Sequence, residues 1–198
     1  MIKALFLDRD GVVNNTVKRF NEEYKKYIDD SPFNCSELNF NSEIKDVLNY
    51  GIKKRYMPII ITNQPSIIKG NMNMKDYEDI TSNICNFLNI SRSQIFECFH
   101  KESLSMECQC RKPKPGLFLM AKGLFDIDLG KSIMVGDSYR DLIAANSAGV
   151  YKKVYLTRSK DKNQIGNIED KLYMMKKNNA FPVITINYLN EIISKEII

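Results

Sequence analysis

The chain has 198 residues, of which 43% are hydrophobic and 27% charged, and its formal net charge is +5. This length and composition are typical of one soluble globular domain that buries a full core. No apolar run reaches the roughly 20 residues of a membrane helix, and the first apolar run meets Asp8 too early for a signal peptide. We therefore expect a single domain over residues 1–198, a monomer in the cytoplasm with no membrane partner.

The basic charge is concentrated at one end of the chain. Residues 151–198 hold nine Lys or Arg and five Asp or Glu, so they carry +4 of the net +5. We interpret this excess as a solvated helical face, which is more common than a nucleic-acid surface. The five cysteines are an odd number, and in a cytosolic chain metal ligation or burial is expected in place of disulfides.

The first part of the chain alternates apolar runs with amphipathic ones. Residues 2–7 predict a strand buried on both faces. Residues 15–41 lack periodicity and predict a long loop that covers the site. Ser42 predicts the start of a helix that Gly51 ends or loosens. Residues 57–61 predict a second buried strand.

The remainder of the chain repeats this alternation. Predicted strands cover residues 94–99, 132–135, 153–157 and 183–186, and predicted helices cover residues 74–89, 115–124 and about 140–149. In the second of these helices Pro115 suits the first turn, and Leu117, Phe118, Ala121 and Leu124 continue the helix. Residues 158–180 predict a loop plus a helix, and the last ten residues predict a terminal helix.

Strands that alternate with helices predict an α/β fold with a doubly wound parallel sheet and no large cap domain. In such sheets ligands bind outside the carboxyl ends of the strands. The residues that follow successive predicted strands are polar: Asp8 and Asp10, then Thr62 and Asn63, then Arg111 and Lys112, then Asp137 and Asp141. The sequence therefore predicts an active site along this edge.

Asp8 and Asp10 are spaced i, i+2 at the end of a strand, so their side chains point to the same side. Two carboxylates about 4 Å apart repel by about 4 kcal/mol at an effective dielectric near 20. Such a pair needs a cation, a shared proton or both. An ordinary Asp-x-Asp-Gly turn is the alternative interpretation of the same residues.

Carboxylates together with one lysine and one hydroxyl suit phosphoryl transfer. Acyl transfer is disfavoured because no histidine or cysteine base lies among them. Asp8 and Asp137 can hold Mg²⁺, which prefers carboxylate oxygens. One aspartate can attack phosphorus while the other protonates the leaving oxygen. Thr62 and Lys112 would bind the transferring oxygens.

A second cluster contains the only histidine of the chain. Cys98, His100, Cys108 and Cys110 lie within thirteen residues and match a closed tetrahedral zinc site. With four protein ligands and no position for water, the ion would be structural. It would hold residues 98–110 as a small zinc loop and so place Arg111 and Lys112 at the site. The alternative is a chance cluster of reduced cysteines with a surface histidine.

These motifs, in this order, resemble the haloacid dehalogenase superfamily of phosphatases. The Cys/His pairs followed by Arg-Lys-Pro-x-Pro-Gly further resemble the D-glycero-D-manno-heptose 1,7-bisphosphate phosphatases and the histidinol-phosphate phosphatase domain. The resemblance implies that Asp8 is the nucleophile and a Mg²⁺ ligand, and that Asp10 is the general acid/base and ligates through its backbone carbonyl. Asp137 would complete the metal site, and Thr62 and Lys112 would stabilise the phosphoryl group. The implied substrate contacts are Asn14, Asn63, Gln64 and Arg111.

The implied activity is hydrolysis of a small phosphorylated metabolite, with heptose 1,7-bisphosphate as the leading substrate and histidinol phosphate as the runner-up. Pro65-Ser66 and the length of residues 15–41 depart from the heptose phosphatase pattern, in loops that are expected to contact the sugar. A polynucleotide 3'-phosphatase is a minor alternative. A nucleic-acid-binding zinc module is another, but it leaves the strand-end aspartates unexplained, and carboxylates beside a phosphate backbone weaken binding.

Overall fold

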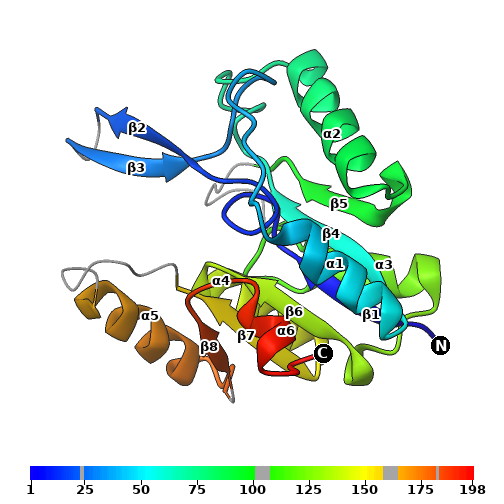
Figure 1. Ribbon diagram of the computed structural model, residues 1–198. Helices are drawn as coiled ribbons and strands as arrows, with labels where there is room; N and C mark the ends of the chain where they lie inside the picture. Colours follow the sequence, from blue (N-terminus) through cyan, green and yellow to red (C-terminus); the bar gives the residue numbers. More distant parts are fainter. Residues whose placement is uncertain (23–24, 101–107, 158–164, 182) are drawn as a thin grey trace.

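Six parallel strands form the central sheet of this computed structural model, which describes residues 1–22, 25–100, 108–157, 165–181 and 183–198. Their order is β5-β4-β1-β6-β7-β8, so that β1 lies between the two halves of the sheet (Figure 1). The strands are β1 (Lys3–Leu7), β4 (Tyr56–Asn63), β5 (Ile95–Cys98), β6 (Ile133–Gly136), β7 (Lys152–Leu156) and β8 (Ile184–Ile186). The predicted doubly wound parallel sheet is confirmed.

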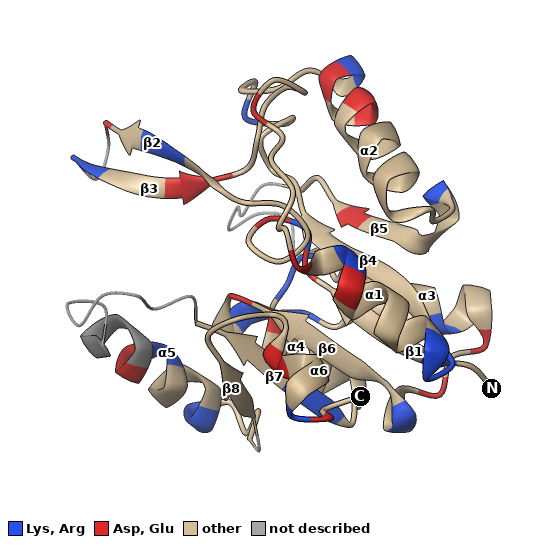
Figure 2. Cartoon of the chain, in the orientation of Figure 1, with Lys and Arg blue, Asp and Glu red and all other residues tan. Residues whose placement is uncertain are grey.

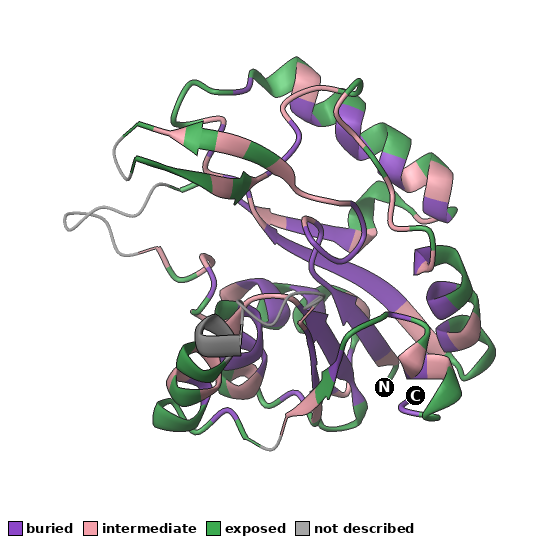
Figure 3. Cartoon of the chain, turned by 60° about the vertical axis from the view of Figure 1, so that its left-hand side comes forward, coloured by how far each residue is buried: buried purple, intermediate pink, exposed green. Residues whose placement is uncertain are grey.

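Helices cover both faces of the sheet. One layer is α1 (Ile44–Lys53), α2 (Met74–Leu88) and α6 (Glu191–Ser194), and the other is α3 (Gly116–Phe125), α4 (Tyr139–Ala148) and α5 (Ile165–Lys177). Leu5 and Leu7 pack into the first layer, and Ala4 and Phe6 into the second. The strands are therefore buried on both faces, as Figure 3 shows in purple.

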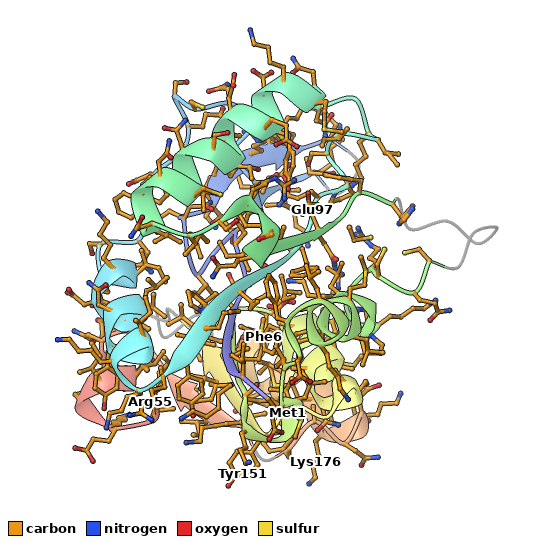
Figure 4. The ribbon with its side chains drawn as sticks, turned by 90° about the vertical axis from the view of Figure 1, so that its right-hand side faces the viewer. Met1, Phe6, Arg55, Glu97, Tyr151 and Lys176 are labelled. Atoms are coloured by element: carbon orange, nitrogen blue, oxygen red, sulfur yellow. The ribbon has the colours of Figure 1, made fainter. Side chains whose placement is uncertain are left out.

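Phe6 of β1 packs at the centre of the interface between the sheet and the second helical layer. It is labelled in the middle of Figure 4, and its ring lies edge-on to that of Phe118 in α3, with centroids 4.9 Å apart. Aromatic rings prefer this arrangement to face-to-face stacking. This contact fixes β1, and with it the residues that follow β1, against α3.

The helix ends explain where the predicted boundaries hold and where they are wrong. Gly149 ends α4 with a positive φ of 88°, as predicted. Gly51 does not end α1: it is buried within the helix, where a Cβ atom would lie 2.9 Å from Leu5 Cδ2, so glycine permits close packing on β1. Ser42 does not cap α1, which begins at Ile44 without a side-chain cap. Leu124 continues α3, as predicted, and is 62% exposed there.

Residues 17–30 are not the predicted loop. They contain an antiparallel hairpin of β2 (Val17–Asn21) and β3 (Lys26–Asp30) that projects away from the main sheet. Its strands carry charges of both signs and alternate between half-buried and exposed residues, so they lack the apolar alternation that predicts a strand (Figure 2). The hairpin meets the core near its base, where Ser31 Oγ lies 3.4 Å from Ser66 Oγ.

The C-terminal predictions hold in part. The helix expected within residues 158–180 is α5, while residues 158–164 lie outside the described residues. The predicted terminal helix is only the single turn of α6, with four residues. Among the described residues, no helix is long and apolar enough to cross a membrane. No large cap domain is present in that part of the chain either.

Candidate active site

Asp8 follows the last residue of β1 and is held in place by the neighbouring strand. Its backbone N–H donates to the Val135 carbonyl in β6 at 3.1 Å, and the residue is 8% exposed. Three residues further on, Gly11 has φ +98°, and a Cβ atom there would lie 1.8 Å from Asp137 Oδ2. Glycine therefore lets the chain turn away from the strand while the Asp137 carboxylate approaches it closely.

Three carboxylates meet at this edge of the sheet. Asp8, Asp137 and Asp141 offer carboxylate oxygens that all lie within 4.8 Å of one another. Asp8 follows β1, Asp137 follows β6, and Asp141 lies in the first turn of α4, where Ser138 N donates to its Oδ2 at 3.0 Å. The strand order places β1 beside β6 at the reversal of the winding, which is where ligands bind in such folds.

Lys112 supplies a buried cation to this group. Its Nζ lies 2.8 Å from Asp8 Oδ1 and 2.6 Å from Asp141 Oδ1, and it donates to the Ile61 carbonyl at 2.9 Å. Burial opposes the charge on Lys112, but the charges of Asp141 and Asp8 outweigh burial and hold the lysine pKa above its ordinary value. The two carboxylates therefore favour the charged form of Lys112.

The single positive charge of Lys112 does not balance the negative charges of the three carboxylates. Burial raises the pKa of Asp8 well above its ordinary value, the charges of Asp141 and Asp137 raise it further, and Lys112 offsets only part of this. The ionised form of Asp8 therefore calls for another positive charge nearby.

Asn63 positions Lys112. Its Oδ1 accepts from Lys112 N at 3.0 Å, and its Nδ2 donates to the Lys112 carbonyl at 3.1 Å. This two-point contact ties the segment after the Cys/His cluster to the end of β4. The structure thus gives the Asn63 amide a backbone partner, whereas the sequence predicted a substrate contact.

Asp10 points its carboxylate into a set of donors. Oδ1 accepts from Arg9 Nε and Asn14 Nδ2, and Oδ2 accepts from Arg9 Nη2 and Gln64 Nε2. Gln64 Nε2 also lies 2.9 Å from Thr62 Oγ1, and Thr62 is 1% exposed at the end of β4. Asn14 and Gln64, predicted as substrate contacts, are fully buried and face Asp10.

The four predicted zinc ligands converge. Sγ of Cys98 lies 3.8 Å from Sγ of Cys108 and 3.1 Å from Sγ of Cys110, and His100 Nδ1 lies 3.1 Å from Sγ of Cys110. Neighbouring sulfurs around a tetrahedral zinc ion with bonds of about 2.3 Å lie about 3.8 Å apart. Burial and the neighbouring thiols raise the pKa of Cys98 to about 12, so its thiolate form also calls for a cation.

The Cys/His cluster is connected to the active site by Arg111 and Lys112. Arg111 is half-buried and its Nη1 donates to the His100 carbonyl at 3.1 Å. Cys110 directly precedes this pair in the chain. Residues 101–107 of the predicted zinc loop lie outside the described residues.

Two site residues were given no individual role from the sequence. Asp141 was predicted only as a carboxylate at the active-site edge, and the Ser138-x-x-Asp141 capping box places it at the start of a helix. Arg9 lies inside the first motif and is only 1% exposed. No sequence signal marks it, because arginine is usually exposed.

Comparisons with known proteins agree with this fold and site. Residues 109–172 match a family described as HAD-hydrolase-like. The D-glycero-alpha-D-manno-heptose-1,7-bisphosphate 7-phosphatase of Campylobacter jejuni is 30% identical over 186 residues, which cover 88% of this chain and 96% of that protein. The D-glycero-beta-D-manno-heptose-1,7-bisphosphate 7-phosphatase of Vibrio cholerae is 30% identical and covers 79% of this chain and 82% of that protein.

A solved structure shows the same fold. The D,D-heptose 1,7-bisphosphate phosphatase from B. bronchiseptica, complexed with magnesium and phosphate, has a TM-score of 0.72 and 24% identity, covering 99% of this chain and 98% of that chain. The parallel sheet with its strand-end carboxylates and buried lysine defines a HAD-like hydrolase. Given the identity and coverage with the C. jejuni protein, the chain belongs to the heptose-1,7-bisphosphate 7-phosphatase family.

Proposed function

We propose that this chain is a Mg²⁺-dependent phosphatase that hydrolyses a phosphorylated sugar through an aspartyl-phosphate on Asp8. The observation that carries the proposal is the buried Lys112 ammonium, 2.8 Å from Asp8 and 2.6 Å from Asp141 beside a third carboxylate. A transferring phosphoryl group carries negative charge on its oxygens, and a buried cation next to the nucleophile stabilises that charge.

The carboxylate group fits a hard divalent cation. We propose that Asp8 and Asp137, with the backbone carbonyl of Asp10, hold Mg²⁺, which prefers oxygen ligands. The raised pKa of Asp8 supports this assignment, because the Asp8 carboxylate needs more positive charge than Lys112 provides. When bound, the ion would offset the repulsion between the Asp8 carboxylate and the substrate phosphate.

The chemistry divides between two aspartates. A carboxylate oxygen of Asp8 attacks phosphorus, the bond from phosphorus to the sugar oxygen breaks, and Asp10 donates its proton to that departing oxygen. Water then attacks the aspartyl-phosphate, Asp10 takes the proton of the water, and the bond between phosphorus and Asp8 breaks to release phosphate. Arg111 contacts the substrate outside the reacting group.

Thr62 and Lys112 stabilise the phosphoryl oxygens in this scheme. Thr62 Oγ1 already lies within hydrogen-bond distance of Gln64 Nε2, at 2.9 Å. An amide N–H can only donate, so the hydroxyl accepts there and keeps its own proton to donate to a phosphoryl oxygen. The buried Lys112 ammonium provides the positive charge beside it.

The substrate that we propose is D-glycero-D-manno-heptose 1,7-bisphosphate, in the synthesis of bacterial surface-polysaccharide precursors. Support comes from the names of the relatives, which are 7-phosphatases of the alpha form in Campylobacter jejuni and of the beta form in Vibrio cholerae. We further propose one domain over residues 1–198 that works in the cytoplasm as a monomer on this small metabolite, without nucleic acid.

Phosphate release tests the substrate directly. Purified protein with Mg²⁺ is offered both anomers of heptose 1,7-bisphosphate, histidinol phosphate and a 3'-phosphorylated oligonucleotide. We expect the highest kcat/KM with one heptose anomer. Faster release from histidinol phosphate or from the oligonucleotide would reassign the substrate, and no release from any of them would overturn the proposed activity.

Lys112→Met is expected to reduce kcat by about 10²- to 10³-fold, because it removes a donor to the phosphoryl oxygens. It also leaves Asp8 and Asp141 buried without their cation, which should lower the free energy of unfolding of the Mg²⁺-free protein by about 3 kcal/mol. Steady-state kinetics and denaturant unfolding measure the two effects. Lys122→Met, on the exposed face of α3, is the matched control and should change neither; a fully active Lys112→Met protein would contradict the role.

Cys110→Ser is expected to remove zinc from the protein. We propose that Cys98, His100, Cys108 and Cys110 hold one structural Zn²⁺, because these thiolates and the imidazole are a typical zinc ligand set and their ligand atoms all lie within 4.8 Å of one another. Elemental analysis should find about one zinc per wild-type chain. Cys35→Ser, at an exposed cysteine outside the cluster, should keep its zinc. Wild-type protein without zinc, or Cys110→Ser protein with a full complement, would rule out the site.

A further inference from the structure

The Asp10 carboxylate accepts four hydrogen bonds from three neighbouring side chains. Oδ1 accepts from Arg9 Nε at 3.1 Å and from Asn14 Nδ2 at 2.9 Å. Oδ2 accepts from Arg9 Nη2 at 3.0 Å and from Gln64 Nε2 at 2.6 Å. These donors therefore fix both the rotation and the plane of the Asp10 carboxylate.

The donors themselves are out of reach of a substrate. Arg9 is 1% exposed and both Asn14 and Gln64 are 0% exposed, whereas the Asp10 side chain is 16% exposed. Arg9 and Asp10 both follow β1 and Gln64 follows β4, so the Gln64 bond to Asp10 joins two strand ends across the site. Arg9 and Gln64 can act on a substrate only through the residues that they hold.

Gln64 and Arg9 each keep a buried polar atom without a hydrogen-bond partner among the described residues. These atoms are Gln64 Oε1 and Arg9 Nη1. A buried polar atom without a partner costs stability that an apolar side chain of similar shape would avoid. Packing alone therefore favours a different residue at each position. The gain from arginine and glutamine is their bonds to Asp10, with the Gln64 bond to Thr62 in addition.

We infer that Gln64 and Arg9 are positioning residues that orient the Asp10 carboxylate for proton transfer and so set the rate of turnover without setting substrate affinity. The inference rests on the proposed function, in which Asp10 exchanges a proton with the departing sugar oxygen and then with water. Misplacement of a reacting group by about 1 Å can cost about 10²-fold in rate. A carboxylate that has lost the Gln64 bond, or the two Arg9 bonds, would sample such misplaced orientations.

Gln64→Met tests the inference, because methionine keeps the length of the side chain and removes both polar atoms. With heptose 1,7-bisphosphate we expect kcat to fall by about 10- to 100-fold, while KM changes less than about twofold. p-Nitrophenyl phosphate has a leaving group that departs without a proton, so nitrophenolate release in the first turnover should slow much less. Gln94→Met, which removes a donor to the Pro58 carbonyl away from the site, is the matched control and should leave both rates unchanged.

Three results would overturn the inference. Unchanged kcat in Gln64→Met would show that the orientation of Asp10 does not depend on Gln64. A raised KM with unchanged kcat would make Gln64 a substrate contact, and equal slowing on both substrates would indicate general damage to the site. Thermal unfolding checks that the variant is folded; if it is not, Arg9→Lys, which keeps the charge but loses the two-point contact, is held to the same criteria.

The wild-type assay separates this inference from the proposed function. If the wild-type protein hydrolyses neither substrate in the presence of Mg²⁺, the proposed function fails and the role of Gln64 and Arg9 fails with it. If the wild-type protein is active and the variants match it on both substrates, only the positioning role fails.

Discussion

Asp8→Asn should lower phosphate release by about 10⁴-fold or more, the loss that follows removal of a catalytic nucleophile. The amide of asparagine is a poor nucleophile and cannot form the aspartyl-phosphate on which turnover depends. Asp8 is 8% exposed at the end of β1, and its carboxylate lies 2.8 Å from the Lys112 ammonium, so the substitution acts directly at the proposed reaction centre. Phosphate release from heptose 1,7-bisphosphate, followed for many hours at high enzyme concentration, measures the effect.

Unfolding cannot account for the expected loss. Burial raises the pKa of Asp8 above its unfolded value, so at neutral pH the ionised carboxylate opposes folding of the Mg²⁺-free protein. Asparagine removes that buried charge, and Lys112 keeps Asp141 as its partner. The Mg²⁺-free variant should therefore unfold at the same temperature as the wild type or higher. Asp29→Asn, at a half-exposed carboxylate of the hairpin, is the matched control and should keep wild-type activity. An Asp8→Asn protein with more than a trace of activity would exclude Asp8 as the nucleophile.

The elements that position the site could be predicted because their sequence signals are local. The apolar run of β1 ends abruptly at Asp8, and β6 ends in the same way before Asp137. In a parallel sheet the carboxyl ends of neighbouring strands share one edge, so the pattern alone brings these aspartates together. The Cys/His cluster was predictable for a similar reason, because its residues are close in sequence.

The side-chain partners at the site could not be predicted in the same way. Gln64 holds Asp10 through a contact that depends on how β4 lies beside β1, and no spacing in the chain specifies which atom it meets. Arg9 holds Asp10, its neighbour in the chain, through a side-chain conformation that the sequence does not specify either. Asn63 likewise contacts Lys112, which is 49 residues away in the sequence. The hairpin was missed for a different reason: neither of its faces is buried in the core, so its strands carry no apolar alternation.

Asp10→Asn should lower kcat by about 10²- to 10⁴-fold, the range expected for loss of a general acid/base. The variant should nevertheless bind Mg²⁺ almost as tightly as the wild type, because the proposed metal contact of Asp10 is its backbone carbonyl and not its carboxylate. Isothermal titration with Mg²⁺ measures this affinity, and Asp8→Asn should show a large loss in the same experiment. Equal loss of affinity in the two variants would overturn the division of roles between Asp8 and Asp10.

The arrangement around Asp10 adds a second expectation for the same variant. Asparagine presents one oxygen and one NH₂ group where the carboxylate presents two oxygens, and Arg9, Asn14 and Gln64 all offer N–H donors there. The NH₂ group of the new amide must therefore face N–H donors, from which it cannot accept a hydrogen bond. An unmade buried hydrogen bond costs about 1–3 kcal/mol. Asp10→Asn should thus be less stable than the wild type, whereas Asp8→Asn should not. This contrast in stability distinguishes the two carboxylates. Hydrogen bonds from neighbouring N–H groups stabilise the carboxylate of Asp10, whereas burial and nearby negative charges destabilise that of Asp8.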